Sequence, residues 1–103
     1  MTESTSFSIK YWAESDRPRE KLLLKGKTSL SDAELLAILI GSGNREESAV
    51  TLSQRILQAS QNELGLLGKK SVKELMKFKG IGEAKAISIV AALELGRRRR
   101  AEE

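Results

Sequence analysis

The stretch Phe78–Ala86, FKGIGEAKA, joins two helix-like segments through Gly-Ile-Gly, with lysines on both sides. A glycine after a helix commonly adopts the left-handed conformation that ends it, which accounts for Gly80. Gly82 lies where the next helix must begin, and its missing side chain leaves the unpaired amides of the first turn accessible. These amides and the positive end of the helix dipole attract anions. The stretch is therefore either a structural hairpin or a phosphate cradle.

A second segment of the chain resembles the one that leads into this stretch. SDAELLAILIGSG at 31–43 and SVKELMKFKGIG at 71–82 each have a serine followed three residues later by glutamate, which is the spacing of a capping box. Each ends in Gly-x-Gly, with a one-residue difference in length, and Ala49 and Ala86 are plausible equivalents in the helices that follow. The pattern indicates an internal duplication.

Helical patterns account for most of the remaining chain. DRPREKLLLKG at 16–26 places Pro18 in a first turn and Gly26 at a helix end. Apolar residues recur at helical spacing through 45–60, and no segment longer than about four residues alternates like a strand. We expect an all-α domain, a compact bundle of about five short helices. Its predicted core draws on both repeats and contains Leu36, Leu39, Leu52, Ile56, Leu75, Ile87, Val90 and Leu93.

Composition narrows the classes of function. The 103 residues suffice for one small domain, and they include neither cysteine nor histidine. Disulfides, thiol nucleophiles, imidazole bases and conventional zinc sites are therefore excluded. The chain has no signal-peptide pattern and no apolar run near the ~20 residues of a membrane span. We expect a cytoplasmic protein that is not an enzyme, has no cofactor and does not contact membrane.

Positive charge is concentrated in the last third of the chain. Residues 1–68 carry 8 Lys/Arg against 9 Asp/Glu, whereas residues 69–103 carry 10 against 5. Such a local excess attracts polyanions. The run Arg97–Arg100 is either a solvated helix end or linker, or a set of contacts to a nucleic-acid backbone.

The segment ELMKFKGIGEAKAISIVAALEL resembles a DNA-binding helix-hairpin-helix motif. That family holds a DNA phosphate on its hairpin amides without reading the base sequence. The resemblance implies that amides around Gly80, Gly82 and Ala84 bind the phosphate while Lys85 adds positive charge. Lys79 would support the site, and Ile81 would pack inward against both helices.

Three separated segments, DRPREKLL, LSDAELLAILI and GIGEAKAISIVAALELGRR, resemble the N-terminal domain of the RadC family, which is named for DNA repair. This implies tandem helix-hairpin-helix repeats of the SAM-like or RuvA C-terminal-like kind. It also implies DNA as partner, with RNA and branched DNA as further candidates. Longer members continue into a JAB-like metal domain, whose histidines this sequence lacks. We expect an N-terminal arm at 1–15, with Ile9 and Trp12 docked, a tandem-repeat domain at 16–96 and a basic helix end or linker at 97–103.

The two hairpins are expected to differ in function. Glu46 and Glu47 follow Gly41-Ser42-Gly43 closely, so their carboxylates should satisfy the amides there and repel phosphate. The first hairpin is thus expected to be a scaffold and the second a non-sequence-specific DNA-backbone site. The alternative is a structural or protein-interaction scaffold that positions a JAB-like metalloprotease domain.

Overall fold

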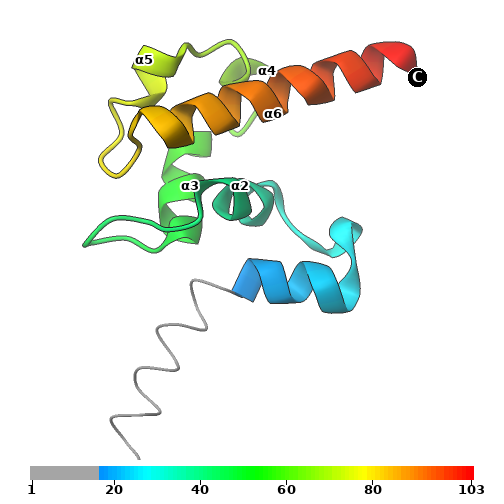
Figure 1. Cartoon of the computed structure of the whole chain (residues 1–103), viewed down its shortest axis with the longest axis horizontal. Coiled ribbons are helices and arrows are strands. Elements are labelled where there is room, and N and C mark those ends of the chain that lie inside the picture. The colour runs from blue at the N-terminus through cyan, green and yellow to red at the C-terminus, as the bar shows by residue number, and fades with distance from the viewer. Residues whose placement is uncertain (1–16) are drawn as a thin grey trace, which may run out of the picture.

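The computed structural model describes residues 17–103, and the predicted arm with Ile9 and Trp12 lies outside this range. The described part is all-helical and contains no strand, which confirms the predicted fold class. A helix over 17–25 is followed by η1 (Lys27–Ser29), α2 (Asp32–Ile40), α3 (Ala49–Gln58), α4 (Leu64–Leu67), α5 (Val72–Leu75) and α6 (Glu83–Glu102). In Figure 1, α6 runs across the molecule above α2 and α3, and the helix over 17–25 lies on the opposite side.

Serine side chains start three of these helices. Ser31 and Ser71 each accept a hydrogen bond from the amide of the glutamate three residues on, Glu34 or Glu74, and that glutamate accepts one from the serine amide. Both predicted capping boxes are therefore confirmed. Ser48 caps α3 by accepting from the Thr51 amide.

Glycines in the left-handed region end the segments as the sequence indicates. Gly26 has φ 89° and donates its amide to the Leu22 carbonyl, which ends the first helix. Gly41 after α2 has φ 81°, and Gly80 after the α5 turn has φ 97°. The two hairpins thus share their first glycine conformation, which L side chains rarely adopt.

The core lies where α2 packs against α3 and where α6 crosses α2 and α5. Leu52, Ile56, Leu75 and Ile89 are fully buried, and Leu36 is 5% exposed. Val90 and Leu93 are partly buried against this cluster. Six of the eight predicted core positions therefore contribute to one shared core.

Two predicted core positions are wrong. Leu39 is 41% exposed because α2 buries Ala33, Leu36, Ala37 and Ile40, a stripe that leaves Leu39 on its flank. Ile87 is 51% exposed because α6 turns the adjacent Ala86 inward.

Beyond Leu93, α6 leaves the core but remains helical through Arg97–Arg100 to Glu102. Glu94 accepts hydrogen bonds from Arg97 and Arg98 at 2.9 Å, and Arg99 pairs with Glu103 at 3.1 Å. Pairs at this spacing support an exposed helix weakly. Nowhere in residues 17–103 is a helix both long enough and apolar enough to cross a membrane.

Candidate anion-binding site at the start of helix α6

The start of α6, like that of α4, lacks the serine cap that α2, α3 and α5 have. Its N-cap is Gly82, with extended backbone at φ −86° and ψ −174°, and no side chain accepts from the first turn. The first amide with a helical acceptor is that of Ala86, which donates to the Gly82 carbonyl at 3.0 Å. Within residues 17–103, the amides of Glu83, Ala84 and Lys85 have no hydrogen-bond acceptor. Such amides attract an acceptor from outside the chain, preferably an anion.

The space at Gly82 is open. A Cβ atom built there meets no atom within 4 Å, and both Gly82 and Ala84 are exposed. Gly80 differs, because a Cβ there would lie 3.1 Å from Asn44 Cβ and 3.4 Å from Leu52 Cδ2. Ile81 is 3% exposed and belongs to the core. The predicted site residues therefore divide into an anchor at Gly80 and Ile81 and an accessible edge from Gly82 to Ala84.

Both lysines predicted beside the site contact the first hairpin. Lys85 Nζ donates to the Ser42 carbonyl at 2.9 Å and to Ser42 Oγ at 3.1 Å. Lys79 Nζ lies 2.7 Å from Glu46 Oε1, and both side chains of this pair are more than half exposed. Two loops that are about 40 residues apart in sequence therefore lie side by side at the start of α6.

Asn44 is a central contact that the sequence did not reveal. Its Nδ2 donates to the Lys79 carbonyl and to Glu47 Oε1, both at 2.9 Å. Its Oδ1 accepts from the amides of Glu46 and Glu47 at 2.8 Å. Asparagine commonly bonds to backbone two or three residues ahead in turns, so the local half of this pattern was recognisable. The contact to Lys79 depends on the tertiary fold.

The expectation that Glu46 and Glu47 satisfy the first hairpin's amides with their carboxylates is wrong. Asn44 accepts from those amides, and Ser48 caps α3. The Glu47 carboxylate instead receives two hydrogen bonds at 2.9 Å from Arg55, which hold the pKa of Glu47 at about 2. The Arg55 guanidinium also lies 5.6 Å from the centre of the Phe78 ring, within cation–π range.

The first Gly-x-Gly turn is closed where the second is open. A Cβ at Gly43 would lie 2.0 Å from the Glu47 carbonyl oxygen, so glycine is sterically required there. The Asn44 amide donates to the same oxygen at 3.0 Å. Five residues separate Gly43 from α3, whereas Gly82 itself begins α6. The first loop therefore supports the second, and the accessible amides belong to α6.

The site suits an anion that accepts several hydrogen bonds, such as a phosphate. Two exposed carboxylates lie in its vicinity, Glu46 on Lys79 and Glu83 in the first turn of α6. Glu83 interacts favourably with the helix dipole and was not identified from the sequence. Among residues 17–103, no three His, Cys, Asp or Glu side chains gather as a metal site would require.

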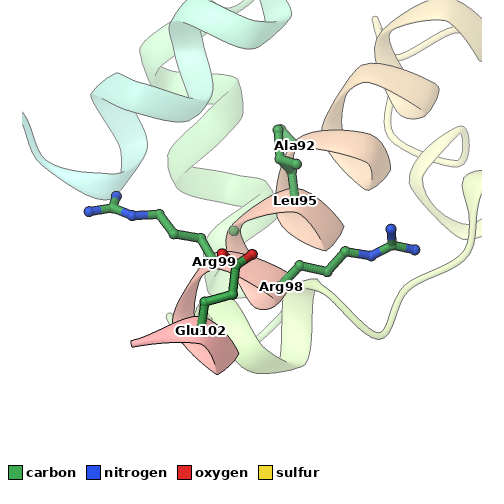
Figure 2. Close-up of a pocket in the computed structure, with 6 residues that line it drawn as sticks. Ala92, Leu95, Arg98, Arg99 and Glu102 are labelled. Carbon is green, nitrogen blue, oxygen red and sulfur yellow. The ribbon is translucent and has the colours of Figure 1, made fainter.

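A surface hollow of about 540 Å³ lies toward the other end of α6 (Figure 2). Its lining comes from Ala92, Leu95, Gly96, Arg98, Arg99 and Glu102. Figure 2 shows the side chains of Arg98 and Arg99 extending to opposite sides of the helix. The hollow is remote in sequence from Gly82 and adds no group to the amide site.

Comparison with known proteins yields relatives along nearly the whole chain. The model of the family described as UPF0758 N-terminal matches residues 9–87. A UPF0758 protein of Flavobacterium johnsoniae is 70% identical over 101 residues, which are 98% of this chain and 44% of the relative. A UPF0758 protein of Porphyromonas gingivalis is 52% identical over 92 residues, which are 88% of this chain and 40% of the relative. The chain thus spans less than half the length of these relatives. No solved structure matched it significantly.

Proposed function

The chain belongs to the UPF0758 N-terminal family, and from that membership and the site geometry we propose that it binds the phosphate backbone of DNA without reading the bases. The contact is made by the start of α6 and the hairpin before it. The module is non-enzymatic, acts in the cytoplasm and serves a RadC-like, DNA-repair-associated protein. RNA and branched DNA offer the same phosphate chemistry and are further candidate ligands.

The observation that carries the proposal is the uncapped start of α6. Ser31, Ser48 and Ser71 each accept one first-turn amide of α2, α3 and α5, whereas no side chain accepts a first-turn amide of α6, which begins at Gly82. The glycine cap leaves α6 less stable than a serine cap would, by a few tenths of a kcal/mol. An anion bound at these amides would offset that cost.

The arrangement of helices supports a helix-hairpin-helix interpretation. α5, the turn through Gly80 and α6 form one hairpin unit, and α2, the turn through Gly41 and α3 form a second. In the first unit, the Asn44 side chain accepts from the amides of Glu46 and Glu47, and the turn leaves no room for a Cβ at Gly43. The unit containing α6 is therefore the DNA-binding one, and the other holds it in place.

Charge near the site implies modest affinity. Lys79 is paired with Glu46, so a phosphate that uses Lys79 must displace a carboxylate. Lys85 contacts the neutral oxygens of Ser42, so a phosphate that uses Lys85 has no carboxylate to displace. We expect two to four neutralised phosphates, which gives a slope of log K against log salt of about −2 to −4 on duplex DNA.

Fluorescence anisotropy of a labelled duplex at low salt tests the proposal. Gly82→Val places methyl groups over the amides, where nothing else stands within 4 Å, so it should abolish binding while the fold persists. Gly65→Val is the matched control, because Gly65 is exposed, also has open space around it and lies in α4. Binding that survives Gly82→Val, or that depends on base sequence, contradicts the proposal.

A scaffold function is a second candidate, supported by the contacts that Lys79 and Lys85 make to the first hairpin. In that case the interlocked loops stabilise a platform for the remainder of a longer protein, including a JAB-like metalloprotease domain. This candidate expects no low-salt affinity for any nucleic acid. It also expects Gly82→Val to leave all binding properties unchanged.

A further inference from the structure

We propose a second contact for the nucleic-acid backbone, a basic ridge formed by Lys69, Lys70, Arg97 and Arg100. The inference rests on the proposed function and extends it to the far half of α6. None of the four residues belongs to the hairpin: Arg97 and Arg100 lie beyond the point where α6 leaves the core, and Lys69 and Lys70 lie in the turn between α4 and α5.

The lysine half of the ridge is fixed against α6. A Cβ at Gly68 would lie 4.0 Å from Leu93 Cβ, so the turn after α4 touches α6 at its last core residue. Lys69 and Lys70 follow directly, and their amides donate to the Leu66 and Leu67 carbonyls at 3.1 Å. Figure 1 shows α4 behind the middle of α6, with the last turns of α6 extending past it.

The arginine half follows from helical spacing. Arg97 and Arg100 lie four and seven residues after Leu93, so they share its side of the helix, which faces the turn with Lys69 and Lys70. Arg97 shares Glu94 with Arg98. In residues 17–103, no carboxylate lies within ion-pair distance of Arg100. Two arginines of α6 and the two lysines of the adjoining turn are thus placed along one side of the helix, with Arg97 also bonded to Glu94.

The ridge and the α6 amides are separated by a distance that suits duplex DNA. From Glu83 to Arg97 and Arg100 the helix rises about 21–26 Å, at about 1.5 Å per residue. Phosphates along one DNA strand are spaced about 3.4 Å apart along the axis, so the span corresponds to about six to eight base pairs. The continuous α6 holds both contacts at fixed separation.

The chemistry favours nucleic acid over a lipid surface. Membrane-surface helices insert apolar side chains beside their cations. The exposed Leu95 lies two residues before Arg97, about 200° around the helix, and so faces away from the ridge. Leu93, on the ridge's side, packs against the core, so no exposed large apolar side chain of α6 lies on that side. A ridge of this kind suits a solvated phosphate backbone.

Salt titrations on a duplex of about 20 base pairs test the ridge, since this length exceeds the span. The ridge makes the wild-type slope of log K against log salt steeper than the value of about −2 to −4 expected of the α6 start alone. Arg97→Gln/Arg100→Gln and Lys69→Gln/Lys70→Gln should each reduce that slope by up to about 2, and weaken binding to all sequences alike. Arg17→Gln/Arg19→Gln removes the same charge from exposed positions on the first helix and should leave the slope nearly unchanged. If the control lowers the slope as much as the ridge variants do, the ridge is overturned.

The outcomes separate this inference from the function on which it rests. If Gly82→Val loses DNA binding while both ridge variants keep the wild-type salt slope and affinity, the ridge alone is overturned. Wild-type binding by Gly82→Val overturns the amide site, whatever the ridge variants do. Cosedimentation with phosphatidylglycerol vesicles that is lost in the ridge variants, without any change in DNA binding, assigns the ridge to membrane and overturns the proposal. Unfolding temperatures of the ridge variants should match wild type, because the substituted side chains lie outside the core.

Discussion

Replacing Gly82 with serine should make the protein more stable and a poorer binder at the same time. Gly82 has φ −86° and ψ −174°, close to the φ −75° and ψ 166° of Ser31 and the φ −81° and ψ 166° of Ser71. A serine at 82 can therefore adopt the same cap geometry without strain, and its Oγ would accept from the Lys85 amide, as in the other caps. The introduced hydroxyl would occupy one of the amides that we assign to phosphate.

The substitution should raise the stability of the fold and lower the affinity for DNA, and the size of each change can be calculated separately. The cap adds a few tenths of a kcal/mol over glycine, and the loss of glycine freedom in the unfolded chain adds about 0.4–1 kcal/mol. For a domain of this size, Tm should rise by about 2–11 °C. Losing one hydrogen bond to a charged phosphate costs about 1.5–3 kcal/mol, so affinity should fall at least about tenfold.

Circular dichroism during heating measures Tm. Fluorescence anisotropy of a labelled duplex at low salt measures the affinity of the same variant. Gly65→Ser, which adds a hydroxyl at another exposed glycine, is the control and should leave affinity unchanged. A raised Tm shows that the cap has formed. A raised Tm with unchanged affinity would refute the reasoning, because the Lys85 amide would then be irrelevant to binding.

Three further predictions concern the core, the hairpin contact and acid stability. Leu52→Ala should lower the free energy of unfolding by about 2–5 kcal/mol, whereas Leu39→Ala should lower it by much less because Leu39 is 41% exposed. Urea denaturation measures both losses, and equal losses would contradict the assigned core. Glu46→Gln removes the carboxylate that competes for Lys79, so DNA affinity should rise about two- to fivefold, and unchanged or weaker binding in anisotropy would show that Lys79 does not contact phosphate. Arg55 holds the pKa of Glu47 at about 2, below its ordinary 4.5, so this ion pair stabilises the fold above pH 4.5 and the stabilisation is lost as pH falls through about 2. Urea midpoints measured across this window should fall less steeply for Glu47→Gln than for wild type, and parallel curves would contradict the assignment.

Local features of the fold could be predicted because they depend on neighbouring residues. The capping boxes at Ser31 and Ser71 and the left-handed turn at Gly80 all formed as expected. The resemblance at family level was confirmed through membership of the UPF0758 N-terminal family, and it drew on three separated segments. Contacts of this kind join residues a few positions apart, so the local sequence is enough to predict them.

Facing directions and long-range contacts could not be predicted in the same way. Leu39 lies in a continuous apolar run, where periodicity does not indicate which side is buried, and Ile87 lies in a similar run. The contacts of Asn44 with Lys79 and of Lys85 with Ser42 join loops separated by 35 and 43 positions. Only the packed arrangement of α2, α3 and α6 brings these loops together. The sequence therefore indicated the accessible amides but not the partners of the two lysines.

The two halves of α6 are held by different forces, although no kink or break separates them. Up to Leu93 the helix is held by the core, and after it by pairs such as Glu94 with Arg97 and Arg98. Backbone amide protons before this point should exchange with deuterium only when the domain opens, whereas those after it should exchange through local fraying at the free end. Salt and acid weaken the pairs around Glu94 without touching the core, so the boundary of fast exchange should advance toward Leu93 under those conditions. One continuous helix would then display both cooperative unfolding and independent helix–coil behaviour.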